Sequence, residues 1–138
     1  MAANTSPIYT RLADIQWAPA VVLTANTAKD GTGTVATIFT ADATNGGFVQ
    51  KVRFRAAGTN VATVARLFIN NGAANTTAAN NVLYEEITLP ATTVSEVAQQ
   101  TNQEILLGFA LPAGYKLLVT VGTTVAAGYY VSTIGGKY

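Results

Sequence analysis

Short runs of apolar residues alternate with polar residues along the chain, with the period of two that is typical of half-buried β-strands. Pairs such as Asp-Gly and Asn-Gly, which favour tight turns, separate several of these runs. The pattern predicts about eight strands. They cover residues 17–24, 34–41, 48–56, 61–69, 82–89, 105–111, 115–121 and 127–134. Strands spaced in this way predict an all-β, antiparallel β-sandwich.

The connections between these strands predict part of the topology. A Gly-Thr-Thr link joins the last two strands and favours an antiparallel hairpin. The longest connection, residues 91–103, is expected to cross from one sheet to the other, as Greek-key topologies require. Residues 1–16 show no sustained strand pattern, so the sequence predicts a short N-terminal arm at 1–16 and one sandwich domain at 17–138.

Alternation within strand 48–56 predicts which residues face solvent. Phe48, Val52, Phe54 and Ala56 share one face, and the opposite face carries a basic stripe. This stripe consists of Lys51, Arg53 and Arg55. It is expected to be a solvated strand face or to pair with a glutamate of a neighbouring subunit.

Strand 61–69 is apolar on both faces, because Phe68 and Val64 lie opposite Leu67 and Ile69. Two explanations are open: either another segment of the chain covers Phe68, or Phe68 lies at the centre of a subunit interface. Glu85 falls in phase with apolar neighbours, which predicts a β-bulge or an ion pair with a residue such as Arg66.

Exposed residues on the predicted arm and strands form a candidate protein interface. Within the arm, Ile8, Tyr9 and Leu12 are expected to act as apolar anchors and Arg11 as a polar rim contact. Of the adjacent tyrosines in strand 127–134, one is expected in the core and the other at the surface. The full candidate set is Ile8, Tyr9, Arg11, Leu12, Lys51, Arg53, Arg55, Arg66, Phe68 and Tyr130.

Composition argues against most reactive chemistry. The chain has no Cys and no His, which leaves neither disulfides nor the commonest metal ligands and general bases. Asp30, Asp42, Glu96 and Glu104 fall in or beside predicted turns and are expected to be solvated or capping groups. The sequence therefore predicts a protein that is not an enzyme and has no catalytic, metal or cofactor site.

Charge and hydropathy argue against nucleic acids and membranes as binding partners. Only 11% of the residues are charged, with a net charge of +1, which does not suit a nucleic-acid-binding protein. The N-terminus has no secretory pattern, and no apolar run approaches the length of a transmembrane helix. Synthesis in the cytoplasm without membrane insertion is expected.

Three segments of the C-terminal two-thirds resemble the small jelly-roll proteins of tailed-phage particles. These are Ile87-Thr88-Leu89-Pro90, the run from Leu111-Pro112-Ala113-Gly114 to Leu117, and Ala127-Gly128-Tyr129-Tyr130-Val131 with Gly135-Gly136. The resemblance implies a jelly-roll fold and a head decoration or cement protein. Such a protein would form homotrimers, bind the major capsid protein and stabilise the head in the virion.

The alternative function is a glycan- or receptor-binding module of a phage fibre or tail. It would show an exposed Tyr or Trp beside Asn or Asp loops.

Overall fold

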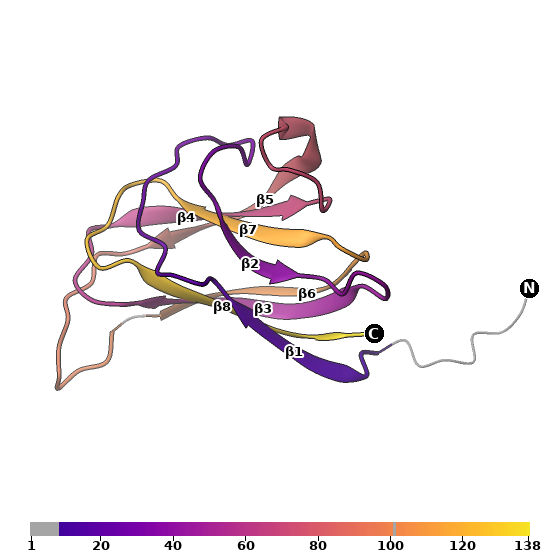
Figure 1. Ribbon diagram of the computed structural model, residues 1–138. Coiled ribbons are helices and arrows are strands. Elements are labelled where there is room, and N and C mark those ends of the chain that lie inside the picture. Colours follow the sequence, from indigo (N-terminus) through magenta and orange to yellow (C-terminus); the bar gives the residue numbers. More distant parts are fainter. Residues whose placement is uncertain (1–8, 101) are drawn as a thin grey trace, which may run out of the picture.

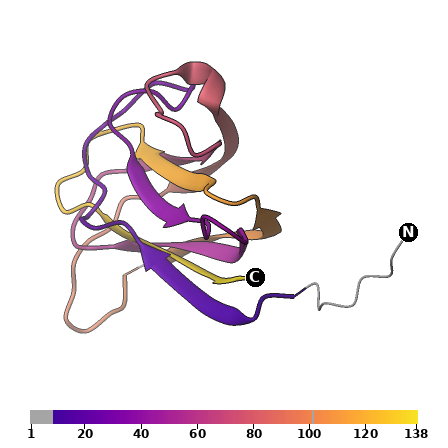
Figure 2. The same ribbon diagram turned by 45° about the vertical axis from the view of Figure 1, so that its right-hand side comes forward.

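The computed structural model describes residues 9–100 and 102–138, which form two four-stranded antiparallel sheets packed as a β-sandwich (Figures 1 and 2). The first sheet has the order β1 (Leu12–Trp17), β8 (Tyr129–Lys137), β3 (Gly47–Ala56) and β6 (Asn102–Leu111). The second has the order β2 (Ala36–Thr40), β7 (Lys116–Val121), β4 (Thr63–Asn70) and β5 (Asn81–Leu89). A 3-10 turn, η1 (Ala78–Asn80), precedes β5. The all-β sandwich prediction is confirmed.

Within the described residues, no helix is long and apolar enough to cross a bilayer.

Most connections carry the chain from one sheet to the other. Among the strands of the described residues, only β4 and β5 are both consecutive in sequence and paired in one sheet. The connection from β5 to β6 crosses between the sheets as predicted. The hairpin predicted for β7 and β8 is wrong, since β7 pairs with β2 and β4, whereas β8 pairs with β1 and β3. Residues 122–128 suffice to span the roughly 10 Å between packed sheets.

The predicted boundary between arm and sandwich at residues 16 and 17 is wrong. β1 begins at Leu12 and pairs along its whole length with β8, from Leu12 opposite Lys137 to Trp17 opposite Ser132. The predicted strand at 17–24 is instead a connection with one isolated bridge, between Val22 and Tyr129. Residues 1–8 of the predicted arm lie outside the described residues.

The sequence pattern did not predict β1, because its apolar residues face solvent and its polar residues face inward. Ile15 and Trp17 are exposed, while the inward positions carry the half-buried polar residues Asp14 and Gln16. The side-chain amide of Gln16 forms the same pair of hydrogen bonds that a strand backbone would form. Its Nε2 donates to the Thr40 carbonyl oxygen at 2.9 Å, and its Oε1 accepts from the Thr40 amide at 2.9 Å.

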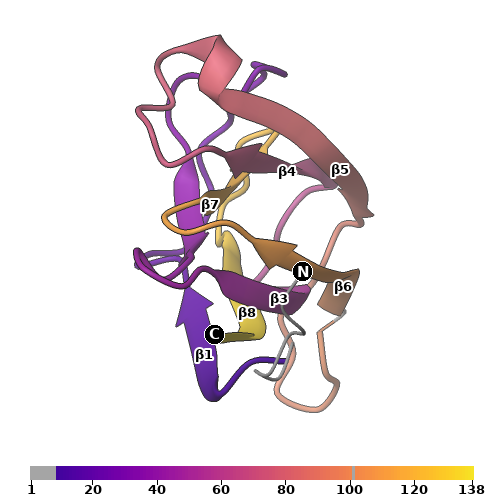
Figure 3. The ribbon, with the colours of Figure 1, turned by 90° about the vertical axis from the view of Figure 1, so that its right-hand side faces the viewer.

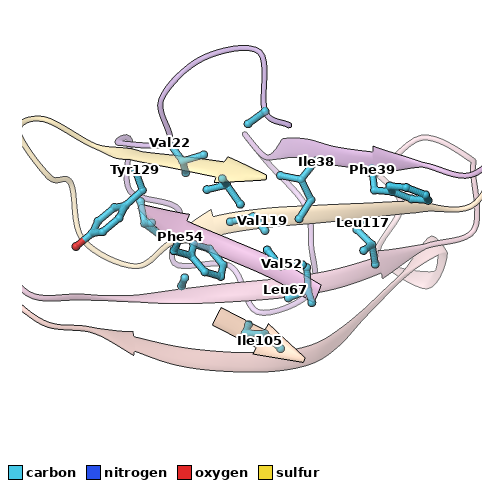
Figure 4. Packing of buried hydrophobic residues seen from close by; sticks show 14 of the residues in the cluster. Val22, Ile38, Phe39, Val52, Phe54, Leu67, Ile105, Leu117, Val119 and Tyr129 are labelled. Atoms are coloured by element: carbon cyan, nitrogen blue, oxygen red, sulfur yellow. The ribbon is translucent and has the colours of Figure 1, made fainter. Parts of the chain in front are cut away.

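The core lies between the facing surfaces of the two sheets (Figure 4). Val52 and Phe54 of β3 and Leu67 and Val119 of the second sheet are at most 1% exposed. Tyr129 closes one end of the core at 2% exposure, and burial raises the pKa of its phenol. Burying an apolar side chain such as that of Phe54 or Leu67 contributes about 1.5–3 kcal/mol.

Bulges shift the inward-facing phase in two strands. The register of β3 slips between Val49 and Lys51, so Val49 is fully buried and Phe48, predicted inside, is only partly covered. In β5 the register slips opposite Leu67 and Phe68, and Glu85 is exposed, so the predicted bulge is confirmed.

Two large apolar residues on the outer face of the second sheet, Phe68 and Leu118, are buried by the chain itself. Phe68 lies between Leu83 and Leu118 in register and is fully buried. The loop from Gly72 to Asn75 lies near Leu118, and Asn75 fastens it by donating to the Gly31 and Gly33 carbonyl oxygens at 3.0 and 2.9 Å. Because Phe68 is fully buried within the described part of the chain, the predicted subunit interface centred on it is wrong.

Asn60 holds three connections together at one end of the sandwich. Its Nδ2 donates to the Gly128 carbonyl oxygen at 3.0 Å, and its Oδ1 accepts from the amides of Ala127 and Gly128 at 2.8 and 2.9 Å. Its backbone exchanges two hydrogen bonds with Thr92. The side chain is 3% exposed, so these partners have no substitute in solvent.

Candidate functional site: the outer face of the β1-β8-β3-β6 sheet

The outer face of the first sheet is not covered by any described segment in the way that the second sheet is. Antiparallel register places residues from all four strands in rows across it. Three rows cross this surface: Ile15–Ile134–Lys51–Leu106, Trp17–Ser132–Arg53–Glu104, and Tyr130–Arg55–Asn102. We call these residues the aromatic–basic face.

Large apolar side chains on the aromatic–basic face are open to solvent. Trp17 is 66% exposed, Tyr130 62% and Leu106 78%. Ile15 and Ile134 lie directly opposite each other, at 57% and 37%. Because these residues share one face of a single sheet, they form one surface rather than scattered exposed side chains.

The basic side chains of this face are partly neutralised from β6. Arg53 Nε donates to Glu104 Oε1 at 2.7 Å, and Lys51 Nζ lies 3.4 Å from the same oxygen. The hydrogen bond from Arg53 and the nearby charges hold the pKa of Glu104 below its ordinary value. Arg55 has no ion pair within residues 9–100 and 102–138, so the face keeps an excess of positive charge.

This combination suits macromolecular docking. Trp, Tyr and Arg are enriched at protein interfaces and at their energetic centres, whereas isolated exposed residues carry no such meaning. A four-stranded sheet also presents these groups on a rigid backbone, which lowers the entropy lost on binding.

The aromatic–basic face contains four of the ten predicted interface residues: Lys51, Arg53, Arg55 and Tyr130. The prediction that one adjacent tyrosine is buried and the other exposed is also confirmed. Arg66 does not belong to this face, because it lies on the second sheet with an 11% exposed side chain and pairs with Glu86 at 2.9 Å. Its predicted interface role stays a prediction.

The predicted arm anchors are not brought onto this face. Tyr9 and Arg11 precede β1 and are exposed. Leu12 is the first residue of β1 and lies on the opposite face of the strand from Ile15. Ile8 lies outside the described residues. The residues that the sequence did not identify are Ile15, Trp17, Leu106 and Ile134. Ile15 and Trp17 are two residues apart, so they share one face of a strand. This spacing was the signal that could have identified these two residues.

A second feature brings three carboxylates near one another. β5 and β6, the edge strands of the two sheets, lie on the same side of the sandwich (Figure 3), and Glu85, Glu86 and Glu104 line a groove of about 280 Å³ between them. The low pKa of Glu104 makes it a poor proton donor, and Glu86 is paired with Arg66. No group of acidic residues in the described parts of the chain is arranged to hold a metal ion.

Two other acidic residues act as turn caps, as predicted. Asp30 Oδ1 accepts from the amide and hydroxyl of Thr32, and Asp42 Oδ1 accepts from the amides of Thr44 and Asn45. These hydrogen bonds lower the pKa of each carboxyl. Glu104, which was also predicted to be a capping or solvated group, is instead a paired residue within β6.

Comparisons with protein families, with curated proteins and with solved structures find no match to this chain.

Proposed function

We propose that this protein is an accessory structural protein of a phage particle, a capsid decoration or cement protein, and that the aromatic–basic face is its docking surface. The observation that carries the proposal is the row arrangement of Trp17, Tyr130 and Leu106 with Arg53 and Arg55 on one uncovered sheet face. The partner is the major capsid protein, and the site of action is the capsid surface of the virion.

The strand order supports a jelly-roll interpretation of the sandwich. β1, β8, β3 and β6 alternate in sequence with β2, β7, β4 and β5 of the facing sheet, apart from the β4–β5 pair. Two Greek keys wound into two four-stranded sheets produce an arrangement of this kind. The resemblance of the C-terminal segments to phage jelly-roll proteins points in the same direction.

The proposed mechanism is binding without catalysis. A decoration protein adheres through many copies, and engaging several modest contacts at once raises avidity by roughly 10²–10⁴-fold. A homotrimer would supply three docking faces on one particle-binding unit. A stable contact of this kind covers about 800 Å² per partner.

The first prediction tests the aromatic–basic face. We expect Trp17→Ser combined with Tyr130→Ser to weaken binding to particles that lack this protein by at least tenfold, or about 1.4 kcal/mol. Both side chains are exposed, so the melting temperature should stay close to that of the original chain. The measurement is a sedimentation binding assay, with circular dichroism as the folding control.

Val82→Ser provides a matched control, because Val82 is 55% exposed on an edge strand of the other sheet. It should leave particle binding unchanged. Light scattering of the original chain, the double variant and Val82→Ser separates self-association from capsid binding. If the aromatic–basic face joins copies of this chain, the double variant should no longer form the oligomer. A folded double variant that decorates particles as tightly as the original chain would contradict the proposal.

Exposure of Trp17 and Tyr130 also favours a second candidate, a glycan- or receptor-binding module of a fibre or tail. The Asn-rich loops do not adjoin these aromatics in register, and Asn26 and Asn75 use their amides to hold backbone carbonyl groups. Saturable binding of a host-surface glycan that is lost in the Trp17→Ser, Tyr130→Ser variant would favour this candidate over the cement protein.

A further inference from the structure

The charges on the aromatic–basic face do not balance. β3 presents Lys51, Arg53 and Arg55, and the three rows add one acidic residue, Glu104 of β6. Lys51 and Arg53 both contact the same carboxylate oxygen of Glu104. Three positive charges against one negative charge leave these rows with an excess of two positive charges.

Arg55 is the cation of this face that has no ion pair with Glu104. It is exposed and makes no ion pair within residues 9–100 and 102–138. Its partners across the sheet are Tyr130 on β8 and Asn102 on β6, which are both uncharged. A guanidinium group presents a planar fork of N–H donors that matches a carboxylate in a bidentate arrangement. Arg55 is therefore available to an anionic group of a partner.

A partner that covers Tyr130 also covers Arg55. The two residues lie directly opposite each other on neighbouring strands, where Cβ atoms are about 4.5–5.5 Å apart. Tyr130 is 62% exposed, so most of its side chain is open to contact. A guanidinium group that loses its water in an interface without gaining an acceptor is costly. A carboxylate of the partner offsets this cost, because charge-assisted hydrogen bonds are the strongest that a protein surface forms.

The position of Glu104 favours a carboxylate of a protein over the phosphates of a nucleic acid. Nucleic acids present a continuous line of negative charge, which proteins bind through an extended basic surface. Glu104 lies opposite Arg53 in the middle row and would repel such a line. A single carboxylate at Arg55 lies in the next row, roughly 7 Å further along the strands.

We propose that the surface docked on the aromatic–basic face presents a carboxylate to Arg55 and apolar groups to Trp17 and Tyr130. This inference rests on the function proposed above, because it names the chemistry of the partner at the same face. The partner surface is an acidic patch of a protein, and Arg55 is the residue that selects it.

The first test measures binding of the full chain to particles that lack this protein. Arg55→Gln should weaken binding about tenfold and reduce its dependence on salt. The salt series runs from about 0.01 M to about 0.15 M, over which the Debye length falls from about 30 Å to about 8 Å. Lys29→Gln is the matched control, because Lys29 is an exposed cation outside this face without an ion pair in the described residues. It should bind as the original chain does.

Glu104→Gln should have the opposite effect on binding. It removes the one negative charge in the three rows and leaves Lys51 and Arg53 without their carboxylate partner. Binding to an acidic surface should become at least threefold tighter at about 0.01 M salt. Circular dichroism checks the fold of each variant. Weaker binding of a folded Glu104→Gln variant would contradict the acidic partner.

A second test does not need particles. Hexaglutamate is titrated into the full chain at low salt, and amide chemical-shift changes report where it binds. The resonances of Arg55, Tyr130 and Asn102 should shift more than those around Lys29, and Arg55→Gln should remove these shifts. Hexalysine should not shift them. Single-stranded oligothymidylate should bind no more tightly than hexaglutamate.

Together the two tests distinguish this inference from the function on which it rests. Hexaglutamate binding at Arg55 by a chain that does not bind particles would overturn the capsid function and support an acidic partner. Particle binding that is unchanged in folded Arg55→Gln would support capsid docking and overturn the acidic partner. Hexaglutamate shifts spread equally over all exposed cations, or tighter binding of oligothymidylate at Arg55, would also overturn it.

Discussion

At the scale of single residues, polar side chains stabilise the connections that the strands leave irregular. Asn60 is the clearest example, because one buried side chain satisfies three backbone groups from the loop before β8. Sequence alternation could not identify it, since an asparagine in a polar stretch is also typical of a solvated turn.

We expect Asn60→Ala to lower the free energy of unfolding by about 2–3 kcal/mol, because it leaves buried amides and a carbonyl group without partners. Urea denaturation followed by fluorescence would show a lower midpoint with the same slope. Asn45→Ala is the control, because Asn45 is exposed in a turn, and it should change the stability by less than about 0.5 kcal/mol. An Asn60→Ala midpoint equal to that of the control would refute the buried-network explanation.

Glu104 gives the protein a pH-dependent contribution to stability. Its pKa in the folded state lies below the ordinary value of 4.5, chiefly because Arg53 hydrogen-bonds to the carboxylate. The contribution is therefore fully present above about pH 4.5 and is lost as the pH falls through the lower, folded-state pKa. The lowered pKa values of Asp30 and Asp42 act in the same direction.

Glu104→Gln should lower the melting temperature at neutral pH and make it less sensitive to acid between about pH 5 and pH 3. Differential scanning calorimetry across this range is the measurement. Glu96→Gln, in the exposed β5–β6 connection, should follow the acid dependence of the original chain. If the two variants show the same dependence, the ion pair on β6 does not contribute.

At the scale of strands, close approach between backbones restricts particular positions. Gly135 of β8 lies opposite Val49, at the bulge of β3, and a Cβ there would collide with the Phe48 carbonyl oxygen. Gly108 of β6 differs, since a Cβ would meet no atom within 4 Å, although its φ of +66° disfavours other residues.

This contrast predicts two different costs. Gly135→Ala should destabilise the fold by about 3 kcal/mol, because the neighbouring strand must move. Gly108→Ala should cost about 1 kcal/mol through backbone conformation alone. Chemical denaturation of both variants is the measurement, and equal costs would show that strand spacing at Gly135 adjusts freely.

Seven of the eight described strands could be predicted because they are apolar-rich runs bounded by turn residues, several of them with a period of two. β1 could not, because Ile15 and Trp17 face outward and Gln16 faces inward. The same reversal concealed Ile15 and Trp17, two of the four residues of the candidate site that the sequence did not identify. The basic stripe of β3 was evident from its alternation, but its aromatic and aliphatic neighbours come from strands far away in sequence.

The pairing of strands also could not be predicted from the local sequence pattern. Residues 122–128 read as a short link between neighbouring strands, but β7 and β8 belong to opposite sheets. Bulges at Val49–Lys51 and at Leu67–Phe68 changed the phase of otherwise regular runs. A one-residue slip reverses every later side chain, so Phe48 was assigned to the wrong face.

At the scale of the whole molecule, the two sheets differ in how their outer faces are used. The second sheet has Phe68 and Leu118 buried on its outer face, while the first leaves Trp17 and Tyr130 exposed. This asymmetry places Trp17 and Tyr130, the two most exposed aromatic residues of the described strands, on one side of the protein. It is the feature that most favours a single direction of docking.

The position of β8 between β1 and β3 also bears on how the protein acquires its structure during synthesis. β8 is translated after both of its neighbours, and β1 has no other partner in its sheet. The first sheet therefore cannot pair in its native order on the ribosome until the last strand has emerged. Such long-range pairing slows folding, so the nascent chain keeps unpaired strand edges available to chaperones until translation reaches β8.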